Sequence, residues 1–191
     1  MTGQPIGIIG AGAWGTALAS VMPQNHEQVL LWALEPEVVE AVNAGKGNPL
    51  YLPDLALPST VRATGDLADM AGCSALLLVT PAQHLRKSLE RLPETDAPLL
   101  LCSKGIEAGT QMLVSEIVAE LRPDNPLAVL SGPTFAHEVA AGKPTAITLA
   151  CESEALGKLL MRLVATPAFR PYWSDDVVGA EIGGAVKNVL P

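Results

Sequence analysis

Three glycines near the N-terminus constrain the fold of this chain more than any other feature. Gly10, Gly12 and Gly15 form a G-x-G-x-x-G pattern between an apolar run that begins at Ile6 and a helix-compatible stretch over residues 16–22. A strand that turns tightly into a helix directs backbone N–H groups and the positive helix end at one point, which suits a pyrophosphate. The motif therefore predicts the start of a dinucleotide-binding β-α-β unit.

The pattern alone is weak, because the chain holds 17 glycines and a close helix–strand contact uses the same residues. A second strand-like run, Val29–Trp32, follows at the distance expected of a β-α-β unit. Glu35 comes just after it, where such folds usually place an acid for the ribose hydroxyls of adenosine. These two features favour dinucleotide binding over the purely structural interpretation.

Strand-like and helix-like segments alternate along the chain. Short apolar runs, typical of strands covered on both faces, lie at Ile6–Ile9, Val29–Trp32, Ala75–Val79, Pro98–Cys102, Leu127–Leu130 and Thr145–Leu149. Helices are expected at Gly15–Met22, Glu37–Asn43, His84–Leu92, Gln111–Leu121, Thr134–Ala141 and Glu154–Val164. The alternation predicts an α/β fold with a doubly wound, mainly parallel, Rossmann-like sheet. Residues Ala44–Ser59 are rich in Gly, Pro and Asn, and are expected to form a long surface connection.

The composition of the chain excludes several classes of partner and ligand. The net charge of −8 argues against nucleic acid or an anionic membrane as the main partner, so an anionic ligand needs local positive groups. Cys73, Cys102 and Cys151 are widely spaced, and no cluster of Cys and His has metal-ligand spacing; we expect reduced thiols in a cytoplasmic protein and no metal site. The N-terminal apolar run lacks a basic flank and is broken by glycines, so we expect neither a signal peptide nor a transmembrane segment.

Ligands of doubly wound sheets bind beyond the carboxyl ends of the strands. The segments in that position are the glycine turn, Leu34-Glu35, Thr80–His84, Ser103–Gly105 and Ser131–Thr134. Lys104 either binds an anion or polarises a carbonyl there, or is a solvated surface lysine. Ser131–Thr134 either offers backbone donors to a ligand or forms the N-cap of a helix with proline in its first turn. These residues by themselves favour the N-cap. His84 and His137 are more often structural or exposed than acid–base groups in such positions.

The C-terminal residues 181–191 are apolar and begin to resemble a helix, and the sequence then stops at Pro191. We expect them to be the first residues of a further domain, with residues 1–180 forming the nucleotide-binding domain. The alternatives are a stand-alone dinucleotide-binding module that ends near Pro191, and a related Rossmann reductase.

Six motifs in register carry a resemblance to the NAD(P)-dependent glycerol-3-phosphate dehydrogenases over essentially the whole chain: residues 10–17, 31–32, 51–53, 103–105, 131–136 and 183–188. The resemblance implies a cofactor domain followed by an all-helical substrate domain, and a homodimer when full length. It also implies hydride transfer between NAD(P) and the pair glycerol 3-phosphate and dihydroxyacetone phosphate, which feeds glycerophospholipid synthesis. Among the rivals, a ketopantoate reductase or a 3-hydroxyacyl dehydrogenase is disfavoured by the motifs at 131–136 and 183–188.

The resemblance also assigns roles to residues. Lys187 would be the catalytic lysine, which exchanges a proton with the substrate oxygen; its pKa must then fall from about 10.4, and a nearby Lys104 is one means of lowering it. The implied substrate-binding residues are Lys104, Gly132, Thr134 and Lys187. The implied cofactor-binding residues are Gly10, Ala11, Gly12, Ala13, Trp14, Gly15, Leu34, Glu35, His84, Lys104 and Ala136.

Two departures from the family pattern matter. Bacterial members often carry a cation at position 34, whereas this chain has Leu34 followed by Glu35, which offers nothing to a 2′-phosphate and favours NAD over NADP. The Arg-Asn pair that grips the substrate phosphate, and an aspartate near the catalytic lysine, would lie in the helical domain beyond residue 191. The chain as given is therefore expected to bind a dinucleotide weakly or partly and not to turn over.

Overall fold

The secondary structure alternates between strands and helices throughout residues 3–186, which are the residues that the computed structural model describes. The strands are β1 (Ile6–Ile9), β2 (Val29–Trp32), β3 (Val61–Thr64), β4 (Ala75–Leu78), β5 (Leu99–Leu101), β6 (Leu127–Ser131), β7 (Thr145–Ala150) and β8 (Phe169–Ser174). The α-helices are α1 (Ala13–Val21), α2 (Pro36–Asn43), α3 (Ala82–Arg91), α4 (Val114–Leu121), α5 (Ala136–Ala140), α6 (Glu154–Val164) and α7 (Val177–Val186). Two 3-10 helices, η1 (Met22–Gln24) and η2 (Leu67–Gly72), complete them.

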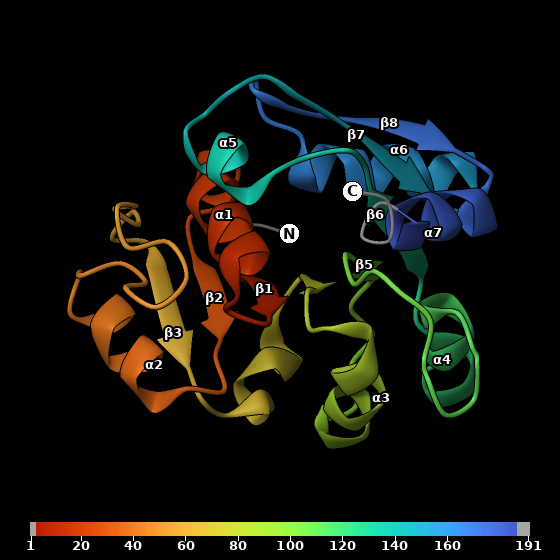
Figure 1. Ribbon diagram of the computed structural model, residues 1–191, viewed down its shortest axis with the longest axis horizontal. Helices are drawn as coiled ribbons and strands as arrows, with labels where there is room; N and C mark the ends of the chain where they lie inside the picture. Colours follow the sequence, from red (N-terminus) through yellow and green to blue (C-terminus); the bar gives the residue numbers. More distant parts are fainter. Residues whose placement is uncertain (1–2, 187–191) are drawn as a thin grey trace.

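The strands form one sheet in the order β3-β2-β1-β4-β5-β6-β7-β8 (Figure 1). All neighbours pair in parallel except β6 and β7, which run antiparallel. The order reverses direction at β1, between β2 and β4, which makes the sheet doubly wound and confirms the predicted α/β, Rossmann-like fold. The carboxyl ends of β1, β2, β4, β5 and β6 consequently meet at one edge.

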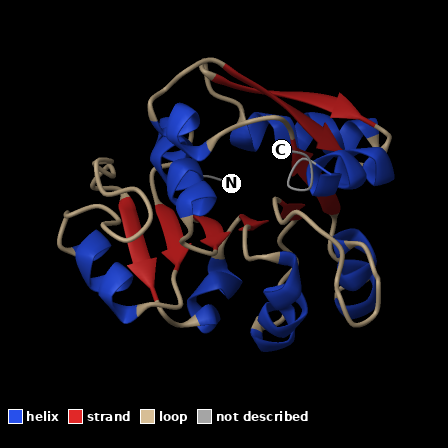
Figure 2. Cartoon of the chain, in the orientation of Figure 1, coloured by secondary structure: helices blue, strands red, loops and turns tan. Residues whose placement is uncertain are grey.

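Helices cover both faces of the sheet (Figure 2). The side chains on one face of the central strands pack with α1, α2, α5 and α6, and those on the other face pack with η2, α3 and α4. Strands covered on both faces need apolar residues at every position. β1, β4 and β5 are buried along their whole length, which explains why their short apolar runs were readable from the sequence.

Two strands were not predicted, and both lie at the edges of the sheet. β3 alternates buried and exposed residues, and β8 contains Arg170 and Pro171 in its middle. Edge strands lack the continuous apolar run of buried ones, and proline is tolerated there because one side of the strand has no hydrogen-bonded neighbour. Continuous apolar runs therefore predict the central strands of the sheet but not its two edge strands.

Two predicted helix starts were wrong for reasons of backbone geometry. The helix expected from Gln111 begins at Val114, because Gln111 has a φ of 61°, which an α-helix cannot contain. The helix expected from Thr134 begins at Ala136, and its N-cap is Phe135 rather than a residue of Ser131–Thr134. The Thr134 N–H donates to the Gly132 carbonyl at 2.9 Å in a tight turn, so this segment is a shaped loop and the favoured N-cap interpretation is corrected.

Residues Ala44–Ser59 are packed on the fold and are not merely a surface connection. Leu52 and Leu57 pack against the core on the α1 side of the sheet, and Asn48 is fully buried. The domain boundary expected between residues 180 and 181 falls inside α7. No helix among residues 3–186 is long and apolar enough to cross a membrane.

Candidate functional site

The glycine turn has the geometry that a phosphate-binding loop requires. Gly10 has a φ of 117°, and a Cβ on it would lie 3.0 Å from the backbone nitrogen of Thr80. A Cβ on Gly15 would lie 1.8 Å from the Gly10 carbonyl oxygen, so α1 approaches β1 as closely as its glycine allows. A Cβ on Gly12 would meet nothing within 4 Å, which leaves open space against the backbone of the turn. The turn is thus tight at Gly10, open at Gly12 and closely packed at Gly15.

The N-terminus of α1 suits an anion. Gly12 is its N-cap and carries no side chain to bind the first N–H groups, and the first turn contains no acidic residue. The first N–H groups of a helix have no partner within it. Beside the turn, the indole Nε1 of Trp14 and the hydroxyl of Thr80 are buried and have no hydrogen-bond partner within residues 3–186. Open space, helix N–H groups and two orphaned donors fit a dinucleotide pyrophosphate.

The end of β2 forms a second part of the site. Leu34 is 69% exposed, and Glu35 is the N-cap of α2. The hydroxyl of Tyr51 donates to Oε1 of Glu35 at 2.9 Å, and this bond raises the pKa of Tyr51. A cavity of about 320 Å³ lies at the same strand end and is lined by Ala33, Leu34, Pro36, Val39, Glu40 and Gly65. An acid directly after the second strand is the arrangement that receives adenosine ribose hydroxyls in Rossmann-type folds.

Lys104 lies at the end of β5 and reaches the loop after β6. Its Nζ donates to the Gly132 carbonyl oxygen at 3.3 Å, and its side chain is half-buried. Ser103, before it, is buried and donates to the carbonyls of Leu78 and Thr80 at the end of β4. The structure thus brings the Ser-Lys-Gly and Ser-Gly-Pro-Thr motifs together, and Lys104 is not a solvated surface lysine.

Helix α7 packs against β6 and closes the other side of this loop. A Cβ on Gly184 would lie 2.8 Å from Oγ of Ser131 and 3.5 Å from Cγ of Lys104, so glycine permits the close approach. A cavity of about 250 Å³ lies between them, lined by Ser131, Gly132, Pro133, Thr148, Gly179, Ala180 and Gly183. Lys187, the expected catalytic lysine, lies outside the described residues.

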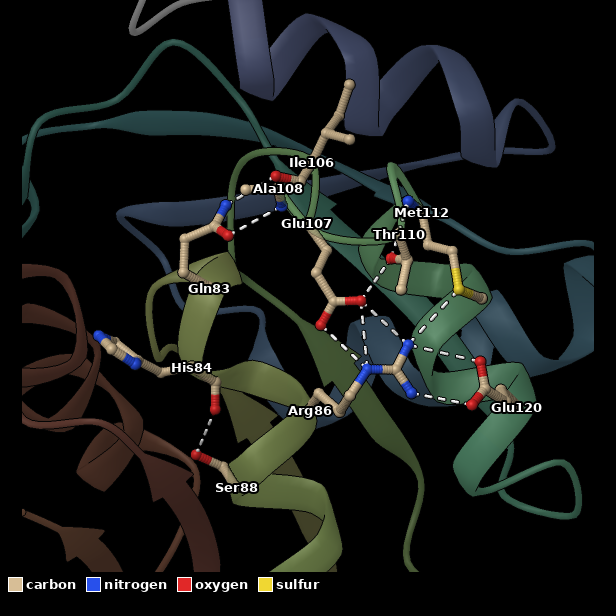
Figure 3. Close-up of polar contacts among 10 residues, drawn as sticks. All are labelled: Gln83, His84, Arg86, Ser88, Ile106, Glu107, Ala108, Thr110, Met112 and Glu120. Atoms are coloured by element: carbon tan, nitrogen blue, oxygen red, sulfur yellow. Dashed lines mark hydrogen bonds and ion pairs between the residues drawn. The ribbon is translucent and has the colours of Figure 1, made fainter.

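The remaining predicted residues occupy the same edge of the sheet. Thr134 is half-buried in the loop after β6, and Ala136 is the first residue of α5, which packs on α1. His84 is exposed in the first turn of α3, and its ring points away from the neighbouring polar cluster (Figure 3). Within residues 3–186, no three His, Cys, Asp or Glu side chains lie close enough together to hold a metal ion.

The loop after Lys104 is tied to α3 by a polar cluster that sequence reasoning missed (Figure 3). The Gln83 amide donates to the Ile106 carbonyl at 2.7 Å and accepts from the Ala108 N–H at 2.9 Å. Arg86 binds Glu107 at 3.0 Å and Glu120 of α4 at 2.9 Å, and the guanidinium lowers the pKa of Glu107. Residues of an amphipathic helix that face a loop carry no motif, so only the fold could reveal them.

Two further residues escaped the sequence analysis. Asn48 lies in the predicted surface connection, yet its buried amide donates a hydrogen bond to the Ala11 carbonyl in the glycine turn. Glu181 on α7 is only 5% exposed and accepts from the N–H of Ser115 at 2.8 Å and from its hydroxyl at 2.5 Å. Burial raises the pKa of Glu181, and the bonds from Ser115 oppose that rise. A lone Asn or Glu has no spacing signal, so the tertiary contact is its only signature.

The fold and the site together define a class. A doubly wound sheet with a glycine turn, an acid after β2 and a lysine bonded to the loop after β6 is a Rossmann-type nucleotide-binding domain of the kind that dehydrogenases use. Comparison with known proteins specifies the family. Residues 5–157 match the model of the NAD-dependent glycerol-3-phosphate dehydrogenase N-terminus, and the chain belongs to that family.

Curated relatives and solved structures agree with this assignment. The chain is 56% identical over 185 residues to glycerol-3-phosphate dehydrogenase [NAD(P)+] of Erythrobacter litoralis, covering 97% of the chain and 56% of the relative. It is 51% identical to the Caulobacter vibrioides protein of the same name, covering 100% of the chain and 58% of the relative. The crystal structure of glycerol-3-phosphate dehydrogenase from Coxiella burnetii is 36% identical, with a TM-score of 0.88, over 97% of this chain and 58% of that one. The chain therefore spans little more than half the length of these relatives.

Proposed function

We propose that this chain is the cofactor-binding part of an oxidoreductase that interconverts glycerol 3-phosphate and dihydroxyacetone phosphate with NAD or NADP. The observation that carries the proposal is the 3.3 Å bond from Lys104 Nζ to the Gly132 carbonyl, which joins the lysine to the Ser131–Thr134 loop on the sheet edge that also holds the glycine turn. The family of the chain and the names of its relatives support the same activity.

The glycine turn would hold the pyrophosphate with the N–H groups of Gly12, Ala13 and Trp14, and the orphaned Nε1 of Trp14 would gain an acceptor. Leu34 and Glu35 would lie at the adenosine ribose, with His84, Lys104 and Ala136 further along the cofactor. When bound, the nicotinamide supplies or accepts the hydride. Gly10, Ala11 and Gly15 shape the turn and leave room for the ligand.

Lys104, Gly132 and Thr134 would bind the substrate, and Lys187 would exchange the proton at its oxygen. An ammonium group beside a ketone oxygen stabilises the alkoxide that forms as hydride arrives, and then donates its proton. Lys104 would also place positive charge near Lys187 and lower the pKa of that amine. The carbonyl of Gly132 fixes Lys104 Nζ, so the cation is oriented before the substrate arrives.

The residues at the end of β2 favour NAD over NADP. Leu34 offers no charge to a 2′-phosphate, and the carboxylate of Glu35 would repel it. We further propose that residues from 181 onward lead into a helical substrate domain, as in the longer relatives, and that the complete enzyme is a cytoplasmic homodimer. Buried free thiols at Cys73, Cys102 and Cys151 fit a reducing compartment.

Two assays test the proposal. Titration with NADH and NADPH, followed by nucleotide fluorescence, should show binding with NADH preferred. Lys104→Met should weaken this binding, and Lys158→Met, at an exposed position of α6, should not. Oxidation of NADH that depends on dihydroxyacetone phosphate should then appear in the intact protein and be lost on Lys187→Ala. A chain that binds neither dinucleotide, or an intact protein that oxidises NADH only with another ketone, would refute the assignment.

A further inference from the structure

Asn48 links the long connection between α2 and β3 to the glycine turn. Its side chain is fully buried, and its Nδ2 donates to the Ala11 carbonyl and to the Thr16 hydroxyl, both at 2.8 Å. The Thr16 hydroxyl donates in turn to the Ala11 carbonyl at 3.1 Å. These bonds form a closed triangle beneath the turn, on the two residues that flank its second and third glycines. Buried networks in which every member is paired are rigid.

The same amide also organises its own segment. Its Oδ1 accepts from the N–H groups of Leu50 and Tyr51, both at 3.3 Å, and the Asn48 carbonyl accepts from the Leu52 N–H at 3.0 Å. We call residues 47–52 the strap. Gly47 begins it with a φ of 70°, and a Cβ there would lie 2.4 Å from the Leu55 carbonyl oxygen. The strap therefore begins with a tight turn whose first residue has no room for a side chain.

The strap ends at the other part of the dinucleotide site. Tyr51, two-fifths exposed, donates its hydroxyl to Oε1 of Glu35 at 2.9 Å. Oε2 of Glu35 takes no part in that bond and remains to accept a ribose hydroxyl. The strap thus connects the turn that would hold the pyrophosphate with the acid that would hold the adenosine ribose, through Asn48 at one end and Tyr51 at the other.

We propose that Asn48 is a positioning residue for dinucleotide binding: it fixes the Ala11 carbonyl and seats the strap, so that Tyr51 orients Glu35 while the glycine turn keeps its shape. This inference rests on the proposed function. It requires that removal of the Asn48 amide lower the affinity for a dinucleotide that the residue does not itself contact. The loss of affinity must also be larger than general destabilisation of the fold would cause.

The test uses two asparagines with the same kind of bonding. Asn125 also donates two hydrogen bonds from its Nδ2, in its case to the backbone carbonyls of Thr95 at 2.7 Å and Ala97 at 3.0 Å, but these residues precede β5 and lie at the opposite edge of the sheet. Asn48→Ala and Asn125→Ala both remove such a pair. Far-UV circular dichroism and thermal melting report folding, and fluorescence titration below both melting transitions reports the Kd for NADH. ADP, measured by competition, probes the adenosine and diphosphate half alone.

We expect Asn48→Ala to raise the Kd for both NADH and ADP at least about tenfold, because the Ala11 carbonyl and the strap both lose the hydrogen bonds that fix them. Asn125→Ala should change either Kd less than about twofold at a comparable loss in melting temperature. If Asn48→Ala does not fold, Thr16→Val removes one corner of the triangle without adding charge and should raise both values in the same direction.

The outcomes are distinguishable. An unchanged Kd in a folded Asn48→Ala or Thr16→Val variant overturns the positioning role and leaves the proposed function standing. Equal weakening by the Asn125 variant overturns it as well, because the effect is then one of general stability. A wild-type chain that binds neither NADH nor NADPH overturns the proposed function and this inference with it.

Discussion

Gly12 and Gly15 belong to the same motif, yet an added methyl group should affect them in opposite ways. A Cβ on Gly12 meets nothing, so Gly12→Ala should leave the melting temperature unchanged and raise the Kd for NADH about ten- to hundredfold by occupying the phosphate's approach. A Cβ on Gly15 would lie 1.8 Å from the Gly10 carbonyl oxygen, so Gly15→Ala should destabilise the fold by about 1–3 kcal/mol. Urea unfolding and NADH titration separate the two effects.

Gly72→Ala is the control for this pair, because its added methyl also meets nothing within 4 Å but lies at the end of η2. It should change neither stability nor affinity. Weak NADH binding by Gly72→Ala, or normal binding by Gly12→Ala, would contradict the assignment of the turn to the phosphate.

Leu34 offers a direct way to change cofactor preference. Its side chain is 69% exposed, so Leu34→Arg should fold normally while it places a cation where a 2′-phosphate would lie. We expect the ratio of NADPH to NADH affinity to rise about tenfold, and the gain to shrink as salt is added. Leu159→Arg, at an exposed position of α6, supplies the same charge elsewhere and should leave the ratio unchanged. An equal shift in both variants would mean that net charge, not position 34, sets the preference.

What the sequence revealed about the site follows from how each residue is recognised. Gly10, Gly12, Gly15, Glu35 and Lys104 follow strands, and the carboxyl ends of parallel strands meet at one edge, so their positions could be predicted before any contact was known. Asn48 and Glu181 act through single tertiary bonds to Ala11 and Ser115, which leave no periodicity or spacing in the chain. Their roles required the fold.

Helices α4 and α7 are joined by a buried carboxylate, and this contact should make stability depend on pH. Burial raises the pKa of Glu181, so between its ordinary value of about 4.3 and the raised value the folded state binds more protons than the unfolded state. The contribution of Glu181 to the free energy of unfolding is therefore greatest at low pH and falls as the pH rises through that window. The bonds from Ser115 limit the fall because they favour the charged form.

Ser115→Ala should deepen that fall. Removing the hydroxyl raises the Glu181 pKa further, so the variant should lose about 1–3 kcal/mol of unfolding free energy at pH 7 and clearly less near pH 4. Urea unfolding at both pH values measures the difference. Ser88→Ala removes a hydroxyl bond within α3 to the His84 carbonyl and should show no such pH dependence. Equal losses at the two pH values would mean that the serine does not stabilise the carboxylate.

The elements that could be predicted are those whose burial produces a recognisable pattern of apolar residues in the sequence. β1, β2 and α6 have the predicted bounds, because a continuous apolar run marks each strand and a helical periodicity of apolar residues marks the helix. The edge strands β3 and β8 lack such a run and were not predicted. The antiparallel pairing of β6 with β7 depends on the path of the chain through α5, which no local sequence pattern encodes. The central sheet could thus be derived from the sequence, and its two borders could not.

The whole molecule places its two ligand-facing halves on opposite sides of the switch point at β1. The proposed adenosine side comprises the glycine turn, Glu35 and the strap, whereas Lys104 and the Ser131–Thr134 loop follow β5 and β6. A ligand that extends across the edge of the sheet must contact both, and a shorter one only the first. Amide hydrogen exchange should therefore show that saturating ADP slows exchange in residues 10–16, 33–35 and 47–52 but not in residues 103–105 or 131–134, whereas NADH protects all five segments. β8 should respond to neither ligand. Protection of residues 103–105 by ADP would place the diphosphate elsewhere, and NADH protection confined to the adenosine side would separate Lys104 from the cofactor.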